Sequence, residues 1–327
     1  MEDFDIIDVH NHLCRTEEEE RDYFPIPGRR AHDRWATPER AIEYMDRNGI
    51  SAMAFMILIP RQQRAPLFQK AKLADLPEGQ RPEERKKLSR QIAPLMREMN
   101  EWGCGIGRRW PRLLPFIGMS DDLGDAEAIA AEVTLRASQG ARGVKMHPGQ
   151  FSCFPDDKVL WPMYEKCQEL GLPVLSDSGP WPHSHLMTMY PNPLGFRLHE
   201  PNQNYAEPKN FARVLEAFPK LTLIMAHLGS AWWDERVELA AQYPNLVFDT
   251  SQGFAAPDQI PVVAHRSLAE EDAVRIFRKI GVERIMFGSD FPGIAPQPQL
   301  EQIMRLPLTD EEKRMILAEN ARRILKI

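Results

Sequence analysis

Two histidines at the end of the first apolar segment have the spacing of a metal site. His10 and His12 follow the apolar run at residues 4–9, which predicts a short buried strand. Successive side chains of a strand point to opposite faces, so residues two positions apart project to the same side. Both imidazoles can therefore bind one ion. The pair is half of a site, and other parts of the chain must supply the remaining ligands.

Further polar residues lie at the ends of later apolar segments or directly after them. They are Lys145, His147, Asp177, His227 and Asp290. Imidazole nitrogens and carboxylate oxygens together form the ligand set that suits Zn²⁺, Fe²⁺ or Mn²⁺, and a catalytic site keeps one position open for water or substrate. These residues predict a catalytic metal centre, provided that the fold brings the segment ends together.

The segments that carry these residues alternate between strand and helix patterns. Short apolar runs without alternation are typical of parallel strands buried on both faces. The eight expected strands are at residues 4–9, 51–59, 113–117, 143–146, 172–175, 221–226, 245–249 and 283–287. A strand and helix repeated eight times predicts an α/β fold, a (β/α)₈ TIM barrel with its site at the C-terminal ends of the strands.

The connections refine this prediction. Thr37-Pro38-Glu39 has the pattern of a helix start, and Thr309 with Glu312 predicts a capping box. A helix is expected over residues 83–102. We expect one domain over residues 1–327, with loop excursions near 60–82 and 180–207 that act as lids or contacts.

Composition restricts the class of partner. The chain of 327 residues has 41 basic and 47 acidic side chains and a net charge of −6. Nucleic acids and anionic membranes favour a concentrated basic surface, so neither is an expected partner. A small-molecule substrate is expected instead.

Cysteine usage and hydropathy suggest the compartment. The four cysteines lie far apart without paired spacing, which favours neither a zinc ribbon nor a disulfide scaffold. The sequence has no apolar signal segment and no apolar run long enough to span a membrane. We therefore expect a cytoplasmic protein.

Four short motifs at the expected strand ends resemble one known family. They read Asp-Val-His-Asn-His at 8–12, Gly-Val-Lys-Met-His-Pro at 143–148, Ala-His-Leu-Gly at 226–229 and Gly-Ser-Asp-Phe-Pro at 288–292. In this order they resemble the amidohydrolase superfamily, and more narrowly the amidohydrolase-2 group. That group includes hydrolases and non-oxidative decarboxylases related to aminocarboxymuconate semialdehyde decarboxylase. The resemblance covers nearly the whole chain.

The resemblance implies roles for individual residues. His10 and His12 match the family's first metal-binding pair, and Asp290 matches the aspartate that binds metal and handles protons. His227 matches the histidine that activates water or orients the substrate. The implied cofactor is a divalent metal ion, expected to be zinc with manganese and iron as alternatives. Barrels of this group often form dimers, so the resemblance also implies a homodimer.

One position departs from the family pattern. The family usually has histidine at the end of strand five, where this chain has Asp177. Asp177 is either a metal ligand, which shifts preference toward harder ions such as Mn²⁺, or a carboxylate that caps a loop. His183 and His185 are alternative sources of the missing imidazole.

The remaining candidates are expected to contact the substrate. Lys145 either pairs with a carboxylate or substrate, or is a carboxylated ligand that bridges two metals. His147 is expected to bind the substrate or support a ligand, and Trp181 to wall the pocket.

Two reactions fit these residues. The favoured hypothesis is hydrolysis of a C–N or C–O bond in a small carboxylated or cyclic substrate, with Asp290 and His227 as catalytic residues acting on metal-activated water. The alternative is non-oxidative decarboxylation of an aromatic or muconate-type acid, in which Asp290 protonates the ring carbon. A metal-free lactonase and a non-catalytic binding barrel are further alternatives.

Overall fold

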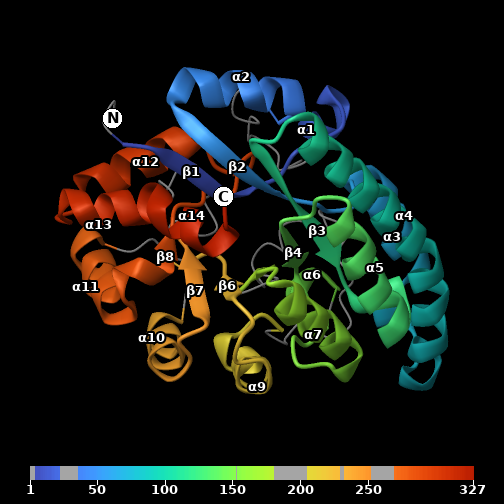
Figure 1. Ribbon diagram of the computed structural model, residues 1–327. Coiled ribbons are helices and arrows are strands. Elements are labelled where there is room, and N and C mark those ends of the chain that lie inside the picture. The colour runs from blue at the N-terminus through green and yellow to red at the C-terminus, as the bar shows by residue number, and fades with distance from the viewer. Residues whose placement is uncertain (1–3, 23–35, 152, 180–204, 229–231, 252–268) are drawn as a thin grey trace.

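Parallel strands lie next to one another in chain order and form the wall of a barrel (Figure 1). The computed structural model describes residues 4–22, 36–151, 153–179, 205–228, 232–251 and 269–327. Within these residues the sheet has eight strands, and every neighbouring pair is parallel. The strands are β1 (Ile6–Asn11), β2 (Ile50–Met56), β3 (Leu113–Met119), β4 (Gly143–Met146), β5 (Val174–Ser176), β6 (Leu223–Met225), β7 (Leu246–Asp249) and β8 (Ile285–Met286). The predicted TIM barrel is confirmed.

The barrel closes through the chain that follows β8. The Val9 amide donates to Phe287 O at 2.9 Å, and the Asp290 amide donates to His10 O at 2.8 Å. A further parallel bridge joins Asn11 and Phe291. Closure thus places His10 and Asp290 on directly neighbouring segments.

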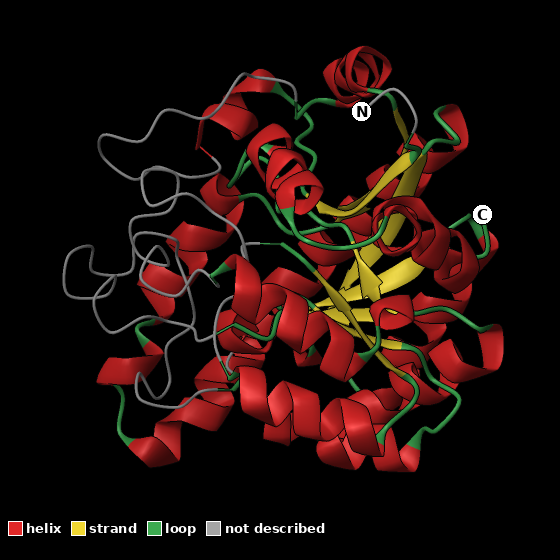
Figure 2. Ribbon diagram, turned by 90° about the vertical axis from the view of Figure 1, so that its left-hand side faces the viewer, coloured by secondary structure: helices red, strands yellow, loops and turns green. Residues whose placement is uncertain are grey.

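Helices surround the sheet and cover its outer face (Figures 1 and 2). Those of the described residues are α1 (Glu17–Asp22), α2 (Pro38–Asn48), α3 (Arg61–Ala71), α4 (Arg81–Arg109), α5 (Ala126–Ser138), α6 (Pro148–Phe151), α7 (Trp161–Leu170), α9 (Ala212–Ala217), α10 (Trp233–Gln242), α11 (Glu270–Ile280), α12 (Pro296–Arg305), α13 (Asp310–Arg314) and α14 (Asn320–Leu325). Two predicted signals are confirmed. Helix α2 begins at Pro38, directly after Thr37, and Thr309 and Glu312 form the capping box of α13. Gly49 ends α2 in the left-handed conformation.

Apolar side chains fill both sides of the sheet. An inner cluster contains Phe116, Leu175 and Ile224, all buried within the barrel strands, and α14 adds Ile324 to it. A larger outer cluster packs the strands against the helices. The barrel is therefore a packed core below the strand ends, and it forms a rigid base for polar groups.

The expected excursion at residues 60–82 is wrong in part, because Arg61–Ala71 is helix α3. Pro66 lies inside α3 and the helix has little segregation of apolar residues, so its pattern resembles a loop. Phe68 nevertheless lies in the outer core. Tertiary packing thus stabilises a helix that its local sequence does not indicate. The second expected excursion lies mostly outside the described residues.

Helix α4 is longer than expected and ends at Arg109 instead of residue 102. Gly103, Gly105 and Gly107 are poor helix formers, yet all three lie inside this helix. A Cβ on Gly103 would lie 2.1 Å from Ile57 Cδ1, and one on Gly107 would lie 2.7 Å from Pro115 Cδ. These glycines let α4 approach β2 and β3 closely. Helix α12 was also not expected from the sequence.

No helix among the described residues combines the length and the apolar character that a bilayer crossing needs.

Replacing Phe116 with alanine tests the inner core. Phe116 is fully buried and its ring lies against Gly143, so Phe116→Ala leaves a cavity and is expected to lower the free energy of unfolding by about 3–5 kcal/mol. Leu135→Ala is the control, because Leu135 is 46% exposed and should change stability by less than about 0.5 kcal/mol. Denaturant unfolding followed by circular dichroism measures both. Equal stability of the two variants would contradict the assignment of Phe116 to the core.

Candidate metal and catalytic site

Three predicted ligands meet at the strand ends. His12 Nε2 lies 3.1 Å from Asp290 Oδ1, and His10 Nε2 lies 3.7 Å from the same oxygen. All three residues are buried, with at most 6% of each exposed. Their ligand atoms lie within 4.8 Å of one another, close enough to bind one metal ion. The sequence spacing of His10 and His12 therefore does bring both imidazoles to one carboxylate.

The backbone near the site has unusual conformations. Asp290 and His227 both have φ of 63°, in the left-handed region that residues other than glycine rarely adopt. Such conformations persist where the surrounding structure fixes them, and they cluster at functional sites. The Asp290 amide is held by His10 O and the His227 amide by Asp249 Oδ1, at 2.8 and 3.1 Å. These hydrogen bonds fix where both side chains leave the barrel.

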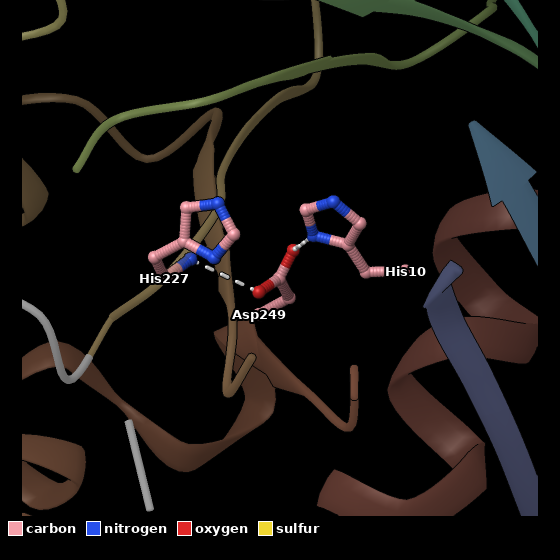
Figure 3. A group of neighbouring side chains, drawn as sticks. All are labelled: His10, His227 and Asp249. Atoms are coloured by element: carbon pink, nitrogen blue, oxygen red, sulfur yellow. Dashed lines mark hydrogen bonds and ion pairs between the residues drawn. The ribbon is translucent and has the colours of Figure 1, made fainter. Parts of the chain in front are cut away.

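Asp249, the last residue of β7, holds His10 in place (Figure 3). His10 Nδ1 lies 2.9 Å from Asp249 Oδ2, while Asp249 Oδ1 accepts the His227 amide. A carboxylate only accepts hydrogen bonds, so Nδ1 of His10 carries the hydrogen and Nε2 presents its lone pair. That lone pair faces Asp290 and is available to a metal ion. Asp249 is therefore the partner that orients a metal-binding imidazole.

His227 is held at both ring nitrogens. Its Nε2 lies 2.9 Å from Asp177 Oδ2, and its Nδ1 lies 2.9 Å from Ser251 Oγ. Ser251 donates its only hydroxyl hydrogen to Asp249 Oδ1, so its oxygen accepts from His227. Both ring nitrogens of His227 then carry hydrogen, which makes the ring a charged imidazolium.

Lys145 and His147 complete the polar cluster from β4 and its end. Lys145 is 2% exposed and its Nζ lies 3.1 Å from His10 Nε2. His147 Nε2 lies 3.7 Å from Asp177 Oδ2. The two predicted substrate-binding residues thus lie beside the predicted ligands.

Burial and charge set the protonation states. Burial, together with the charge of Lys145, lowers the pKa of His10 to about 4, and burial also lowers the pKa of His12. Burial opposes the charged form of His227, yet Asp177 outweighs it and raises the pKa of this ring. Metal binding needs neutral imidazoles, which His10 and His12 supply.

The nearby carboxyl groups are ionised. Burial alone would raise the pKa of Asp290, but the hydrogen bond with His12 and the adjacent imidazoles hold it well below its usual range. His147 and His227 likewise outweigh burial and lower the pKa of Asp177. An ionised Asp290 beside two neutral imidazoles fits a divalent metal ion such as Zn²⁺ or Mn²⁺.

A second group, His10, His227 and Asp249, also has ligand atoms within 4.8 Å (Figure 3). Its groups already bond to one another, since His10 Nδ1 contacts Asp249 and Ser251 Oγ lies within 3.1 Å of both histidines. The group of His10, His12 and Asp290 is the better candidate for a metal site, because His10 Nε2 faces Asp290.

The structure adds three residues to those expected. Asp249 ends a predicted strand at the same rim, so the strand-end rule that found Asp290 also points to it. Ser251 follows two residues later. Arg236, inside α10, is fully buried, and no local sequence signal distinguishes it from a surface arginine. Trp181, His183 and His185 lie outside the described residues.

The fold and the site define the class of protein, a TIM barrel with a candidate metal site of histidines and an aspartate at its strand ends. Sequence comparison identifies the family within this class. The sequence profile of the amidohydrolase family matches residues 7–327, so the chain belongs to this family, the amidohydrolase-2 group. The predicted resemblance is confirmed. A search of curated proteins found no match.

Solved structures share the fold over their full length. A dihydroxybenzoic acid decarboxylase from Polaromonas, with manganese and 2-nitroresorcinol bound, is 16% identical with a TM-score of 0.68, covering 99% of this chain and 96% of that chain. A 5-carboxyvanillate decarboxylase from Novosphingobium aromaticivorans, also with manganese, is 14% identical with a TM-score of 0.67, covering 99% and 97%. A probable 2-pyrone-4,6-dicarboxylic acid hydrolase from Acinetobacter baumannii is 15% identical with a TM-score of 0.58, covering 98% and 99%. At these identities the likeness shows the fold alone.

Asp249→Asn tests the support of His10. The amide is a weaker acceptor and can present its NH₂ group to Nδ1, so we expect affinity for Mn²⁺ or Zn²⁺ to fall by about 10- to 100-fold. Competition with a chromophoric chelator measures the dissociation constant. Asp272→Asn, at an exposed ion pair in α11, is the control and should leave the affinity unchanged. An unchanged affinity in Asp249→Asn would contradict the role of Asp249 in orienting His10 toward the ion.

Proposed function

We propose that this protein is a metal-dependent, non-oxidative decarboxylase of a small hydroxylated aromatic acid. The observation that carries the proposal is the imidazole of His227, contacted at both ring nitrogens by Asp177 and Ser251 in the same cluster as the three candidate ligands. Loss of CO₂ from a carboxylate requires a proton in exchange, and His227 holds one. The full-length likeness to two decarboxylases of aromatic acids supports the same choice over hydrolysis.

In this proposal His10, His12 and Asp290 hold the ion. A bound divalent ion would supply Lewis-acid polarisation of the substrate's carboxylate and hydroxyl oxygens. Zinc was the expected ion, but the two related structures contain manganese, so either metal is a candidate.

Protons move between Asp290, the substrate and His227. Asp290 is ionised, so it can accept the proton of the substrate's hydroxyl group and deliver it to the ring carbon that bears the carboxylate. The C–C bond then breaks, CO₂ leaves, and the product is a phenolate. His227 supplies the proton that converts the phenolate to the phenol, so one proton is consumed for each CO₂ released.

Lys145 and His147 are proposed to bind the substrate's carboxylate. Lys145 Nζ contacts His10 Nε2, the atom that would face the ion. Burial lowers the pKa of Lys145, and the charges of Asp177, Asp290 and Asp249 oppose that shift. In this proposal the ammonium form binds the substrate's carboxylate through a charge-assisted hydrogen bond.

Hydrolysis is the second candidate. The probable 2-pyrone-4,6-dicarboxylic acid hydrolase has the same fold and carries bound citric acid, a small polycarboxylate. In that case Asp290 would act as a base, and the product would be a ring-opened acid with no release of CO₂. The favoured hypothesis from the sequence, a hydrolase, therefore remains a proposal of lower rank.

A substrate panel separates the candidates. We expect the protein with added Mn²⁺ or Zn²⁺ to release CO₂ and a phenol in equal amounts from a benzoate that carries an ortho-hydroxyl group. A chelator should stop the reaction, and added metal should restore it. His12→Ala, which removes one ligand, should lose at least about 100-fold in kcat. Release of a new acid or amine without CO₂ would favour the hydrolase, and activity that survives chelation would favour a metal-free lactonase.

Lys145→Met tests substrate binding. Loss of a charge-assisted contact of about 1.5–3 kcal/mol should raise KM for the carboxylate substrate by about 10- to 100-fold. Steady-state kinetics at saturating metal measure this change. Lys158→Met is the control, because Lys158 lies over the Trp161 ring at the start of α7, away from the site residues. A fall in kcat with unchanged KM would argue against carboxylate binding by Lys145.

A further inference from the structure

We infer that Asp177 is a positioning residue for His227 and that, among the described residues, the metal ion is held by His10, His12 and Asp290. This goes beyond the family resemblance, because it gives the residue at the departing position a different task from the imidazole that it replaces. Its kinetic consequence rests on the proposed function. Its consequence for metal binding does not.

The first observation is the direction of the Asp177 carboxylate. Its Oδ2 lies 2.9 Å from His227 Nε2 and 3.7 Å from His147 Nε2. Its Oδ1 accepts the Gly179 amide at 3.3 Å. Both oxygens are thus engaged. In the described part of the chain, Asp177 belongs to neither of the two groups whose ligand atoms lie close enough for one ion.

The second observation is a clamp between the segments that carry Asp177 and His227. Arg236 donates to Ser178 O at 2.5 Å and to His227 O at 2.6 Å. Ser178 Oγ donates to Ala226 O at 2.6 Å. Arg236 is fully buried, and burial lowers its pKa to about 10, so the guanidinium remains charged at neutral pH. A buried arginine with these partners fixes the spacing between the ends of β5 and β6.

The third observation is how His227 is held on its other side. Ser251 Oγ contacts Nδ1 at 2.9 Å, and the ring stacks on His10 with centroids 5.0 Å apart and planes at 28°. With Asp177 at Nε2, the ring is fixed at both nitrogens and on one face. Removing the Asp177 carboxylate would remove the contact that fixes His227 at Nε2.

The two aspartates therefore orient different histidines. Asp249 orients His10, which faces the ion, and Asp177 orients His227, which holds a proton. A histidine at position 177 would remove the carboxylate that contacts His227 Nε2. The departure from the family pattern thus changes the partner of His227, and the ion keeps an open side for substrate.

The experiment compares Asp177→Asn and Asp177→His with Asp249→Asn as a positive control. We expect Asp177→Asn to bind Mn²⁺ or Zn²⁺ with less than about threefold change in affinity, against the 10- to 100-fold loss of the control. On the substrate found in the panel, kcat should fall about 100-fold with little change in KM. Asp177→Glu should restore part of kcat, and Asp177→His should bind metal without restoring it.

Two results would overturn the inference. One is a loss of metal affinity in Asp177→Asn as large as in Asp249→Asn. The other is an Asp177→His variant with both the metal affinity and the kcat of the unsubstituted protein. The metal titration needs no substrate, so its result stands even if no CO₂ is released and the proposed function fails.

A measurement without substitutions guards against variants that do not fold. In a crystal structure of the zinc-loaded protein, we expect the ion to contact His10, His12 and Asp290 while Asp177 still contacts His227. An Asp177 oxygen about 2.0–2.2 Å from the ion would show that Asp177 is a ligand and would reject the inference.

Discussion

The hydrogen bond between His10 Nδ1 and Asp249 Oδ2 is the contact on which the site depends. It joins β1 to β7 across the chain that follows β8, and Gly288 lies between the two residues. A Cβ on Gly288 would lie 3.0 Å from the His10 Cβ and 3.2 Å from the Asp249 Cβ. The close approach of β1 and β7 therefore both closes the barrel and orients the imidazole that faces the metal. The glycine of the Gly-Ser-Asp motif serves both, because any side chain there would separate β1 from β7.

Burial makes such pairing necessary. Asp177, Asp249 and Asp290 are all at most 7% exposed, and an unpaired carboxylate in this environment would be strongly unfavourable. Each finds an imidazole instead, at 2.9, 2.9 and 3.1 Å. In a low dielectric these contacts fix ring orientation and protonation state together. The cluster thus folds in one arrangement, and its chemistry follows from which histidine each carboxylate contacts.

Much of this could be predicted from local sequence. Strand positions and the polar residues that follow them depend on short apolar runs, so the barrel and the cluster of His10, His12, His227 and Asp290 were found. The features that the sequence did not predict depend on contacts between distant segments. Nothing near Arg236 in the sequence shows that its guanidinium binds carbonyl groups of β5 and β6 ends. The glycines of α4 look like a helix end until β2 and β3 are placed against them.

Asp249 was missed for a different reason. Its residue type and its place at a strand end satisfied the rule that was applied to Asp290, but no recognised motif surrounds it. For Asp177 the sequence left two roles open, a metal ligand and a carboxylate that caps a loop. The structure places its carboxylate against His227 and the Gly179 amide. Position in a family pattern indicates where a residue lies, and only its contacts indicate what it does.

The charges of the cluster explain why substrate and metal should bind together. His10 and His12 are neutral, while the positive charges of His227 and Arg236 offset much of the negative charge of the carboxylates of Asp177, Asp249 and Asp290. A divalent ion beside Asp290 adds further positive charge, and in a buried site that charge acts over the whole cluster. An anionic substrate is therefore favoured beside the ion.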